Sequence, residues 1–210
     1  MQRLLLPLLT ALVILTGCAT TNTTTERSAL PTDYSSYPTD KPEALVFFGY
    51  QCGPCYQFYH QELIHWDERI ENDGQLVLVP VLFDPTVEYA ARAFHAAEIL
   101  GENPQFHAHL FYAYQSGVDL YSEKAVLAFA RQHINVPYAD FQAALRSDLV
   151  DQRMAQAQAL VQQYNIRATP SIIVNRKHLV DPTMVGSTAE LFEEVQNTMN
   201  GGQPGRGSAI

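Results

Sequence analysis

The sequence predicts an α/β fold in which a small sheet domain is interrupted by an all-helical insertion. Apolar runs suited to buried strands occur in two places, within residues 44–82 and within residues 171–180. Between them, the apolar and small residues of segment 86–165 recur at helical spacing, and no convincing strand is present. An amphipathic stretch at residues 188–199 follows the second group of strands. The predicted order is therefore β–α–β, a helical block, and β–β–α.

The first unit consists of a strand, a helix and a second strand. Residues 44–48 form an apolar run of strand length, and residues 75–82 form another. The segment 56–70 between them has the apolar spacing of a helix, at Phe58, Tyr59, Leu63, Trp66 and Ile70. The motif Gln51-Cys52-Gly53-Pro54-Cys55 therefore lies where a strand gives way to a helix.

The helical block and the last unit follow. Four helices are predicted in the block, over residues 86–100, 104–115, 122–133 and 138–164. Ser122 is a suitable cap for the third of them. Strands at 171–174 and 177–180 then pair around Asn175 and Arg176. Pro170 cannot donate to a sheet ladder, so it marks an edge, a bulge or a cis bond, or is an ordinary loop proline.

The N-terminus has the features of a secretory signal. Arg3 precedes an apolar run that is shorter than the roughly 20 residues needed to span a bilayer. The run ends in Leu15-Thr16-Gly17-Cys18, which resembles a bacterial lipobox. We expect residues 1–17 to be a lipoprotein signal peptide and Cys18 to carry the lipid, with ordinary signal-peptide cleavage as the alternative. Ala19 after the cysteine favours the outer membrane over the inner one.

The remaining flanks have the composition of linkers. Segment 18–41 is rich in Thr, Ser, Pro and Asp and is expected to be a flexible tether, while residues 201–210 are expected to be a disordered tail. The chain carries 13 Lys and Arg against 22 Asp and Glu, a formal net charge of −9. This acidic balance argues against a nucleic-acid partner, because such proteins usually present a basic patch.

Cysteine usage points to redox chemistry. If Cys18 carries lipid, only Cys52 and Cys55 remain to pair in an oxidising compartment. Near a helix N-terminus, unpaired backbone N–H groups and the helix dipole stabilise a thiolate, which is the attacking species in disulfide exchange. Cys55 lies within reach to attack a mixed disulfide, and Pro54 presets φ for the helix entry. The motif therefore predicts a thiol:disulfide exchange site.

Other uses of the cysteine pair fit less well. A structural zinc site needs two further ligands, and no two of the seven histidines stand at i,i+4 spacing. A purely structural disulfide that closes so short a loop adds little stability. A lipoprotein that binds Cu(I) through the two thiolates is disfavoured by the small number of methionines, four in the chain. We therefore expect no metal site and no organic cofactor, with the disulfide itself as the redox group.

The whole pattern resembles the DsbA family of thiol:disulfide oxidoreductases, which are thioredoxin-fold proteins with an inserted helical domain. The resemblance covers residues 42–200 and is closest from Phe47-Phe48 to Cys55-Tyr56-Gln57-Phe58. It implies a thioredoxin-like domain formed by residues 42–85 and 166–200, with residues 86–165 as the helical insertion.

The resemblance also implies roles for particular residues. Cys52 would be the exposed nucleophile, Cys55 the buried resolving cysteine, and Pro170 a cis-proline that faces them. Client peptides would be bound by Thr169, Gly53 and Pro54. The implied clients are cysteine-containing exported proteins on the periplasmic side of a bacterial envelope, with a membrane redox partner that recycles the pair.

Two positions depart from the family pattern. Gly53-Pro54 is the dipeptide of thioredoxins and not the Pro-His of strong oxidants, and Val46 stands where DsbA proteins often carry a buried acid. Loss of the histidine should leave the Cys52 thiol less acidic and the disulfide less oxidising. We expect a dithiol oxidase, with a reductase or isomerase that uses the same site as the alternative. The intact cysteine pair disfavours a non-catalytic adaptor.

Aromatic residues of the helical block have two interpretations. They either line a client groove or belong to the core, and their spacing favours the core: Phe111, Tyr112, Tyr114 and Tyr121.

Overall fold

The computed structural model describes residue 34 and residues 40–70, 73–102, 104–180 and 182–203. The predicted signal peptide 1–17, the lipidation site Cys18, most of the tether 18–41 and the tail from residue 204 lie outside the described residues. Within the described ranges, no helix is both long enough and apolar enough to cross a membrane.

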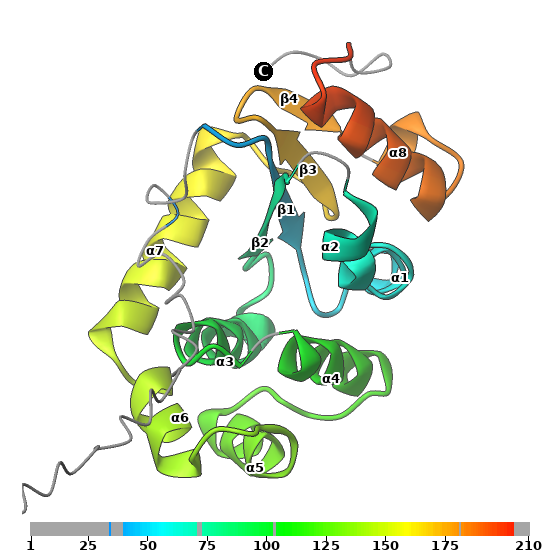
Figure 1. Ribbon diagram of the computed structural model, residues 1–210. Helices are drawn as coiled ribbons and strands as arrows, with labels where there is room; N and C mark the ends of the chain where they lie inside the picture. The colour runs from blue at the N-terminus through cyan, green and yellow to red at the C-terminus, as the bar shows by residue number, and fades with distance from the viewer. Residues whose placement is uncertain (1–33, 35–39, 71–72, 103, 181, 204–210) are drawn as a thin grey trace, which may run out of the picture.

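A four-stranded sheet lies at the centre of the molecule (Figure 1). Its spatial order is β2-β1-β3-β4, and its strands are β1 Glu43–Phe48, β2 Gln75–Pro80, β3 Ser171–Val174 and β4 His178–Val180. β1 pairs in parallel with β2 and antiparallel with β3, which pairs antiparallel with β4. Along the chain, the four strands occur in the order that the sequence predicts.

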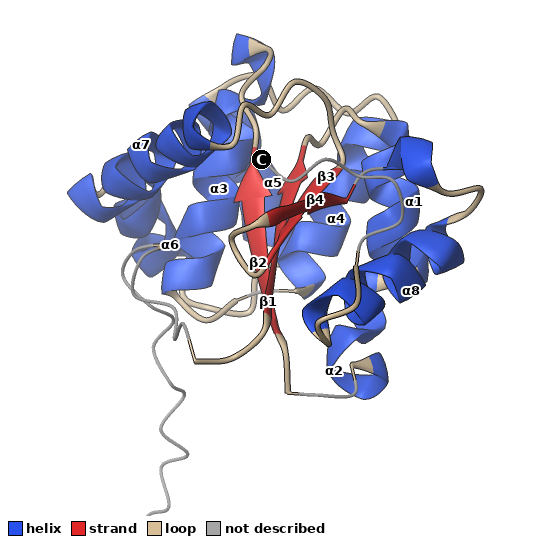
Figure 2. Cartoon of the chain, turned by 90° about the horizontal axis from the view of Figure 1, so that it is seen from above, coloured by secondary structure: helices blue, strands red, loops and turns tan. Residues whose placement is uncertain are grey.

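The helices follow the predicted order, and their bounds are α1 Gly53–Gln61, α2 Trp66–Arg69, α3 Glu88–Ile99, α4 Gln105–Gln115, α5 Glu123–His133, α6 Tyr138–Leu145, α7 Asp148–Gln163 and α8 Thr188–Met199. Figure 2 shows the sheet between α7 on one side and α1 with α8 on the other. α3 to α6 cluster at the end of the sheet where β1 leads into α1 (Figure 1).

β1 is buried along its whole length because helices cover both faces of the sheet. Successive side chains of a strand point to opposite faces. Val46 and Phe48 accordingly join the larger core with α1, α3, α4 and α8, while Leu45 and Phe47 join a second core with α7. The strand that leads to the cysteines is therefore held from both sides.

Two predicted helices are each divided in the structure. The predicted helix 56–70 begins earlier, at Gly53, and α1 ends at Gln61. A short 3₁₀ turn, Leu63–His65, then leads into α2. This turn lets both Leu63 and Trp66 be buried, and the Trp66 indole donates to the Gly74 carbonyl at 2.9 Å.

The predicted helix 138–164 is divided at Arg146 and Ser147 into α6 and α7. The Ser147 hydroxyl accepts a hydrogen bond from the Val150 N–H at 3.3 Å and donates to the Ala144 carbonyl at 2.7 Å. A serine in this position satisfies backbone groups at the start of a new helix. The break lets the second half of α7, with Ala157 and Leu160, cover the sheet.

The hairpin between β3 and β4 turns at Asn175 and Arg176, both of which have positive φ, 50° and 55°. The Lys177 N–H donates to the Val174 carbonyl at 3.0 Å and closes a turn with these two left-handed residues at its centre, inside the loop 175–177 between the paired Val174 and His178. The Arg176 guanidinium pairs with the buried Glu43 carboxylate, with Nη2 and Oε2 3.2 Å apart, and donates to the Tyr34 carbonyl at 2.9 Å. These contacts join the hairpin to Tyr34 and to the first residue of β1.

Side-chain donors join the sheet part to the helical part at backbone carbonyls. The Tyr59 hydroxyl of α1 donates to the Pro104 carbonyl at 3.1 Å, and the Gln115 amide of α4 donates to the Tyr50 carbonyl at 3.0 Å. Within the helical part, the Tyr114 hydroxyl donates to the Thr86 carbonyl at 3.2 Å. The two bonds between the parts involve Tyr59 and Tyr50, which lie within a few residues of Cys55 and Cys52 in sequence.

Removal of the Ser147 cap should destabilise the protein without altering its site. We expect Ser147→Ala to lower the free energy of unfolding by about 1 kcal/mol, since the first turn of α7 loses its side-chain acceptor. Ser147→Asp keeps an acceptor and should stay within a few tenths of a kcal/mol of the parent. Urea unfolding checks both variants, and equal losses for alanine and aspartate would contradict the capping role.

Candidate active site

The two cysteines lie where β1 passes into α1, and they are joined by a disulfide with Cα atoms 5.2 Å apart. Cys52 is the N-cap residue of α1, and its sulfur accepts a hydrogen bond from the Cys55 N–H at 3.1 Å. Cys52 is half-buried, whereas Cys55 is only 3% exposed. An attacking thiolate from outside can therefore approach the Cys52 sulfur and not the Cys55 sulfur.

The helix start favours negative charge on the Cys52 sulfur once the disulfide is opened. The sulfur then keeps the Cys55 N–H as a donor, and it lies in the positive field at the N-terminus of α1. Pro54 occupies the first turn, where its missing N–H costs no hydrogen bond, and it is exposed. A thiolate in this position is a competent nucleophile and leaving group for disulfide exchange.

The loop before β3 faces the disulfide. The peptide bond between Thr169 and Pro170 is cis, and Pro170 is buried. The Cys52 sulfur lies 3.3 Å from the Thr169 carbonyl oxygen. Because a disulfide sulfur carries no hydrogen, this is a contact in the oxidised state that becomes a possible hydrogen bond from the Cys52 thiol after reduction.

An open groove runs beside the disulfide on the sheet side. It is lined by Pro54, Gln57 and Phe58 of the α1 region, by Pro170, and by the segment that leads into α8, with Val185 and Leu191. Its walls also carry the polar residues Gln57, Ser187 and Thr188. A groove of this kind suits an extended peptide next to the half-buried Cys52 sulfur.

The other side of the site is aromatic. Tyr50, immediately before the motif, stacks on Tyr114 with ring centroids 5.6 Å apart, and Tyr114 approaches Tyr121 at 6.2 Å. Tyr121 is 53% exposed and Tyr112 is 64% exposed, whereas Phe111 is fully buried. Phe111 therefore belongs to the core, as its spacing predicts, whereas Tyr112 and Tyr121 lie at the surface, and a client groove there stays a prediction.

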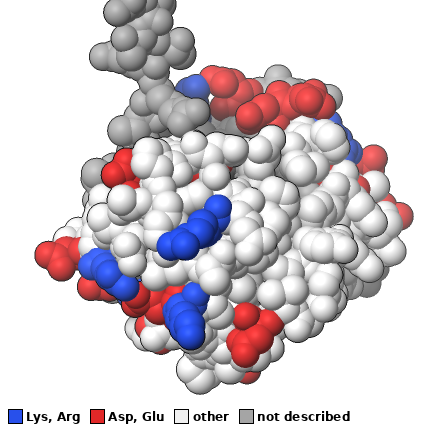
Figure 3. Space-filling model, turned by 90° about the horizontal axis from the view of Figure 1, so that it is seen from below, with Lys and Arg blue, Asp and Glu red and all other residues white. Residues whose placement is uncertain are grey.

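Seen from the side of α5, the molecule carries charged side chains over the centre and left of the face (Figure 3). The right half of this face, on the side of α1 and α4, is mainly uncharged, with charged side chains near its margin. Between residues 83 and 121 of the chain, four large apolar side chains are exposed: Phe83, Tyr112, Val118 and Tyr121.

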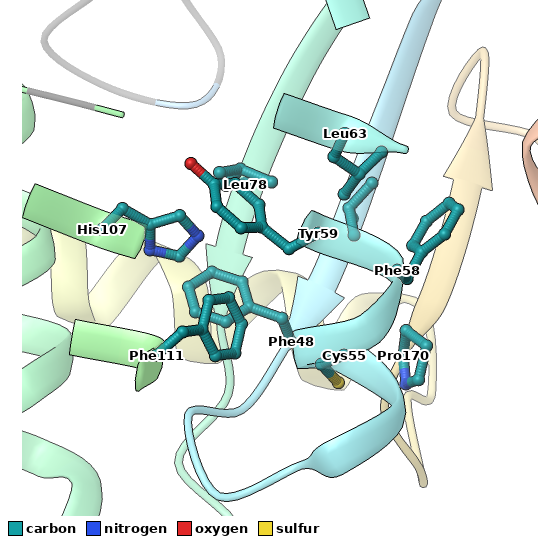
Figure 4. Close-up of a pocket in the computed structure, with 10 residues that line it drawn as sticks. Phe48, Cys55, Phe58, Tyr59, Leu63, Leu78, His107, Phe111 and Pro170 are labelled. Atoms are coloured by element: carbon teal, nitrogen blue, oxygen red, sulfur yellow. The ribbon is translucent and has the colours of Figure 1, made fainter. Parts of the chain in front are cut away.

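Residues behind the disulfide were not predicted from the sequence as part of the site. Cys55 lines a small cavity of about 10 Å³ whose wall also includes Tyr59, Phe111, Pro170 and His107 (Figure 4). His107 accepts or donates a hydrogen bond at Nδ1 to the Tyr50 hydroxyl at 2.8 Å. Burial lowers the pKa of His107 well below its usual value and raises the pKa of the Tyr50 hydroxyl, so both groups are neutral.

The described residues contain no group of three or more His, Cys, Asp or Glu side chains arranged to hold a metal ion. The redox-active group in this part of the chain is the Cys52–Cys55 disulfide.

The CxxC disulfide lies at the N-terminus of a helix, directly after a strand that is covered on both faces, and a loop with a cis-proline faces it. These features define the protein as a thiol:disulfide oxidoreductase with a thioredoxin-like fold. The model of the DSBA-like thioredoxin domain matches residues 59–192. The chain belongs to this family. The matched span begins just after the cysteine pair, so the assignment is independent of the motif itself.

Relatives in sequence and structure agree with this assignment. The chain is 29% identical over 155 residues to the thiol:disulfide interchange protein DsbA of Pseudomonas syringae, covering 73% of this chain and 71% of that protein. It is 28% identical to the DsbA of Azotobacter vinelandii, covering 72% and 71%. The structure superimposes on Pseudomonas aeruginosa DsbA with a TM-score of 0.71 at 23% identity, covering 79% of this chain and 85% of that one. For the oxidoreductase DsbA of Xylella fastidiosa the TM-score is 0.68 at 25% identity, covering 78% and 88%.

The difference in burial between the two sulfurs predicts a difference in reactivity. After mild reduction near neutral pH, iodoacetamide should modify Cys52 at least about tenfold faster than Cys55, because Cys52 is accessible and its thiolate is stabilised. Peptide mapping by mass spectrometry after timed quenching measures both rates. In urea the two rates should converge, and equal rates in the folded protein would contradict the arrangement.

Proposed function

We propose that the protein is a dithiol oxidase that donates the Cys52–Cys55 disulfide to exported proteins. The observation that carries this proposal is the Cys55 N–H bonded to the Cys52 sulfur at the start of α1. A donor at this position stabilises the thiolate of the reduced pair. Stabilising the reduced pair makes the disulfide a stronger oxidant.

In the proposed reaction Cys52 is the sulfur that forms the mixed disulfide and Cys55 is the leaving group. In the reverse direction Cys52 is the nucleophile and Cys55 the resolving cysteine. A client thiolate attacks the accessible Cys52 sulfur and forms a mixed disulfide, while Cys55 leaves as a thiolate. A second client thiolate then attacks the client sulfur of the mixed disulfide and releases Cys52 with its electron pair. The client gains a disulfide, the protein takes up two electrons, and a membrane redox partner reoxidises the pair.

We propose that clients bind as extended peptides across the site. The Thr169 carbonyl lies next to the Cys52 sulfur and offers a backbone acceptor, and Pro170 holds this loop against the pair. The half-buried Gly53 and the exposed Pro54 form the rim of the motif, and the groove toward Leu191 accepts apolar client side chains. The uncharged surroundings suit unfolded chains of varied sequence.

The direction of electron flow is tested by the reduction potential of the pair, measured by equilibration with glutathione buffers. We expect a value above about −180 mV, between protein disulfide isomerase and the strongest oxidants. Pro54→His adds a potential cation beside the sulfur and should shift the value further toward about −120 mV. Cys52→Ser is the control and should show no couple.

A potential near about −270 mV would overturn the oxidase and favour a reductase or isomerase with the same site, in keeping with the Gly53-Pro54 dipeptide. The absence of any reversible couple in the parent protein would reopen the Cu(I)-binding alternative, which metal titration of the reduced pair decides.

We propose further that the protein acts on the periplasmic side of the bacterial envelope, tethered to the membrane, with the outer membrane favoured over the inner. The support is the sequence Leu15-Thr16-Gly17-Cys18-Ala19 after a short apolar run. More than one acyl chain at Cys18 would make the anchoring stable.

Replacement of Cys18 should release the protein from membranes. Expressed in a Gram-negative host, the parent should sediment with the membranes, whereas Cys18→Ser should lose incorporation of labelled fatty acid and leave the lipid-anchored fraction. Thr16→Ser, which keeps a small residue before the cysteine, is the matched control. Equal lipid labelling of the parent and Cys18→Ser would contradict lipidation at this residue.

A further inference from the structure

Gln115, the last residue of α4, places its side-chain amide beside the first residues of the cysteine motif. Its Nε2 atom donates to the Tyr50 carbonyl at 3.0 Å. Its Oε1 atom lies 3.8 Å from the position that a Cβ atom on Gly53 would occupy. Because Gly53 directly follows the reactive Cys52, a polar side chain of the helical part borders the site.

The Tyr50 carbonyl fixes which way the Gln115 amide points. A carbonyl oxygen only accepts hydrogen bonds, so the NH₂ group of the amide must face it, and Oε1 is left on the side of Gly53. Tyr50 is itself held, because its ring stacks on Tyr114 at an interplanar angle of 21°. The Cys52 N–H also donates to the Gly49 carbonyl at 3.1 Å and closes the turn that contains Tyr50. The direction of the Gln115 oxygen is therefore set before any ligand arrives.

The Gln115 oxygen is open to a ligand. The residue is exposed, and no other described residue donates a hydrogen bond to Oε1. Gly53 has no side chain that would cover it. An exposed amide oxygen of this kind exchanges a hydrogen bond with water for one with a ligand N–H at a modest net gain.

A client that is joined to Cys52 comes close to this oxygen. A disulfide holds the Cα atoms of its two cysteines about 4.4 to 6.8 Å apart. Since successive Cα atoms are about 3.8 Å apart, Gln115 Oε1 lies no more than about 9 Å from the Cα atom of Cys52. The backbone amides at and next to the client's cysteine are therefore near enough for one of them to donate to Oε1.

The site lies between acceptors from two parts of the molecule. Figure 4 shows Pro170 on one side of Cys55 and Phe111 of α4 on the other. Thr169, which precedes Pro170, has its carbonyl oxygen 3.3 Å from the Cys52 sulfur. Gln115 follows Phe111 by one turn of α4, so its oxygen borders the motif from the helical part.

We propose that Gln115 is a client-binding residue that accepts a hydrogen bond from a backbone N–H at or next to the client's cysteine. The proposal rests on the proposed disulfide exchange at Cys52. It gives the helical part a share in binding the client backbone. A contact of this kind is independent of client side chains, except that it disfavours proline at the donating position, because proline has no N–H.

The test is an exchange equilibrium at Cys52 in the full chain that carries Cys55→Ser. A glutathione mixed disulfide at Cys52 is equilibrated with peptides that contain one cysteine. The peptides differ by N-methylation of one backbone amide, at the cysteine or at either neighbour. Acid quenching and peptide mapping by mass spectrometry give the ratio of the two mixed disulfides. At one of the three positions, methylation should weaken the peptide's mixed disulfide about fivefold more with Gln115 than with Gln115→Lys, the effect of one hydrogen bond.

Two substitutions separate the acceptor from the bond to Tyr50. Gln115→Lys keeps a donor for the Tyr50 carbonyl and has no acceptor, so it should lose the extra penalty of methylation. Gln115→Glu keeps an acceptor and has no donor for the carbonyl, so it should retain that penalty. Gln163→Lys, at the exposed last residue of α7, is the matched control and should behave as the chain with Gln115 does.

The ratio of methylated to unmethylated peptide is insensitive to a general change in the site, because such a change affects both peptides alike. Penalties that agree within twofold between Gln115 and Gln115→Lys at all three positions would overturn the role of Gln115. That result would leave disulfide exchange intact. Failure of the Cys55→Ser chain to form a mixed disulfide with any of the peptides would refute the proposed function itself.

Discussion

Burial of β1 on both faces is the constraint on which the rest of the structure depends. A strand covered on one side only would have alternating polar residues, whereas this strand contributes Val46 and Phe48 to one core and Leu45 and Phe47 to the other. Its end is thereby fixed in position and direction. The cysteine pair follows within a few residues, so the geometry of the site derives from the packing of the strand.

The motif combines two roles at one position. Cys52 is both the reactive sulfur and the N-cap of α1, where Ser, Thr, Asp or Asn usually supplies the acceptor. A sulfur is a weaker acceptor than those oxygens while it remains in the disulfide, and a much better one as a thiolate. The helix start is therefore better capped in the reduced protein, and this difference links the stability of α1 to the redox state of the pair.

Much of this arrangement could be predicted from the sequence, because strands buried on both faces and amphipathic helices have strong apolar patterns. The last helix has the predicted bounds, and β3 does as well. The division at Ser147 was missed although a serine followed by an acid, Asp148, is a signal for a helix start. The apolar residues keep helical spacing on both sides of residues 146 and 147, and this continuity concealed the break between α6 and α7.

The inner side of the site could not be predicted in this way. His107 occupies a core position of an amphipathic helix, and nothing in its spacing indicates that it reaches the cavity behind Cys55. That proximity arises from how α4 docks on α1, through contacts between residues far apart in the chain. The domain boundaries at residues 85 and 166 likewise stay a prediction, because α7 packs on the helical part and on the sheet.

The bonds between the two parts of the molecule have a consequence for mutational tolerance. Their acceptors are backbone carbonyls, at Tyr50 and Pro104, and every residue type supplies a carbonyl. Their donors are side chains, at Gln115 and Tyr59, and few other types can reach as far. Substitution at an acceptor position is therefore nearly free of cost to these bonds, whereas the two donor positions, one in each part, are constrained.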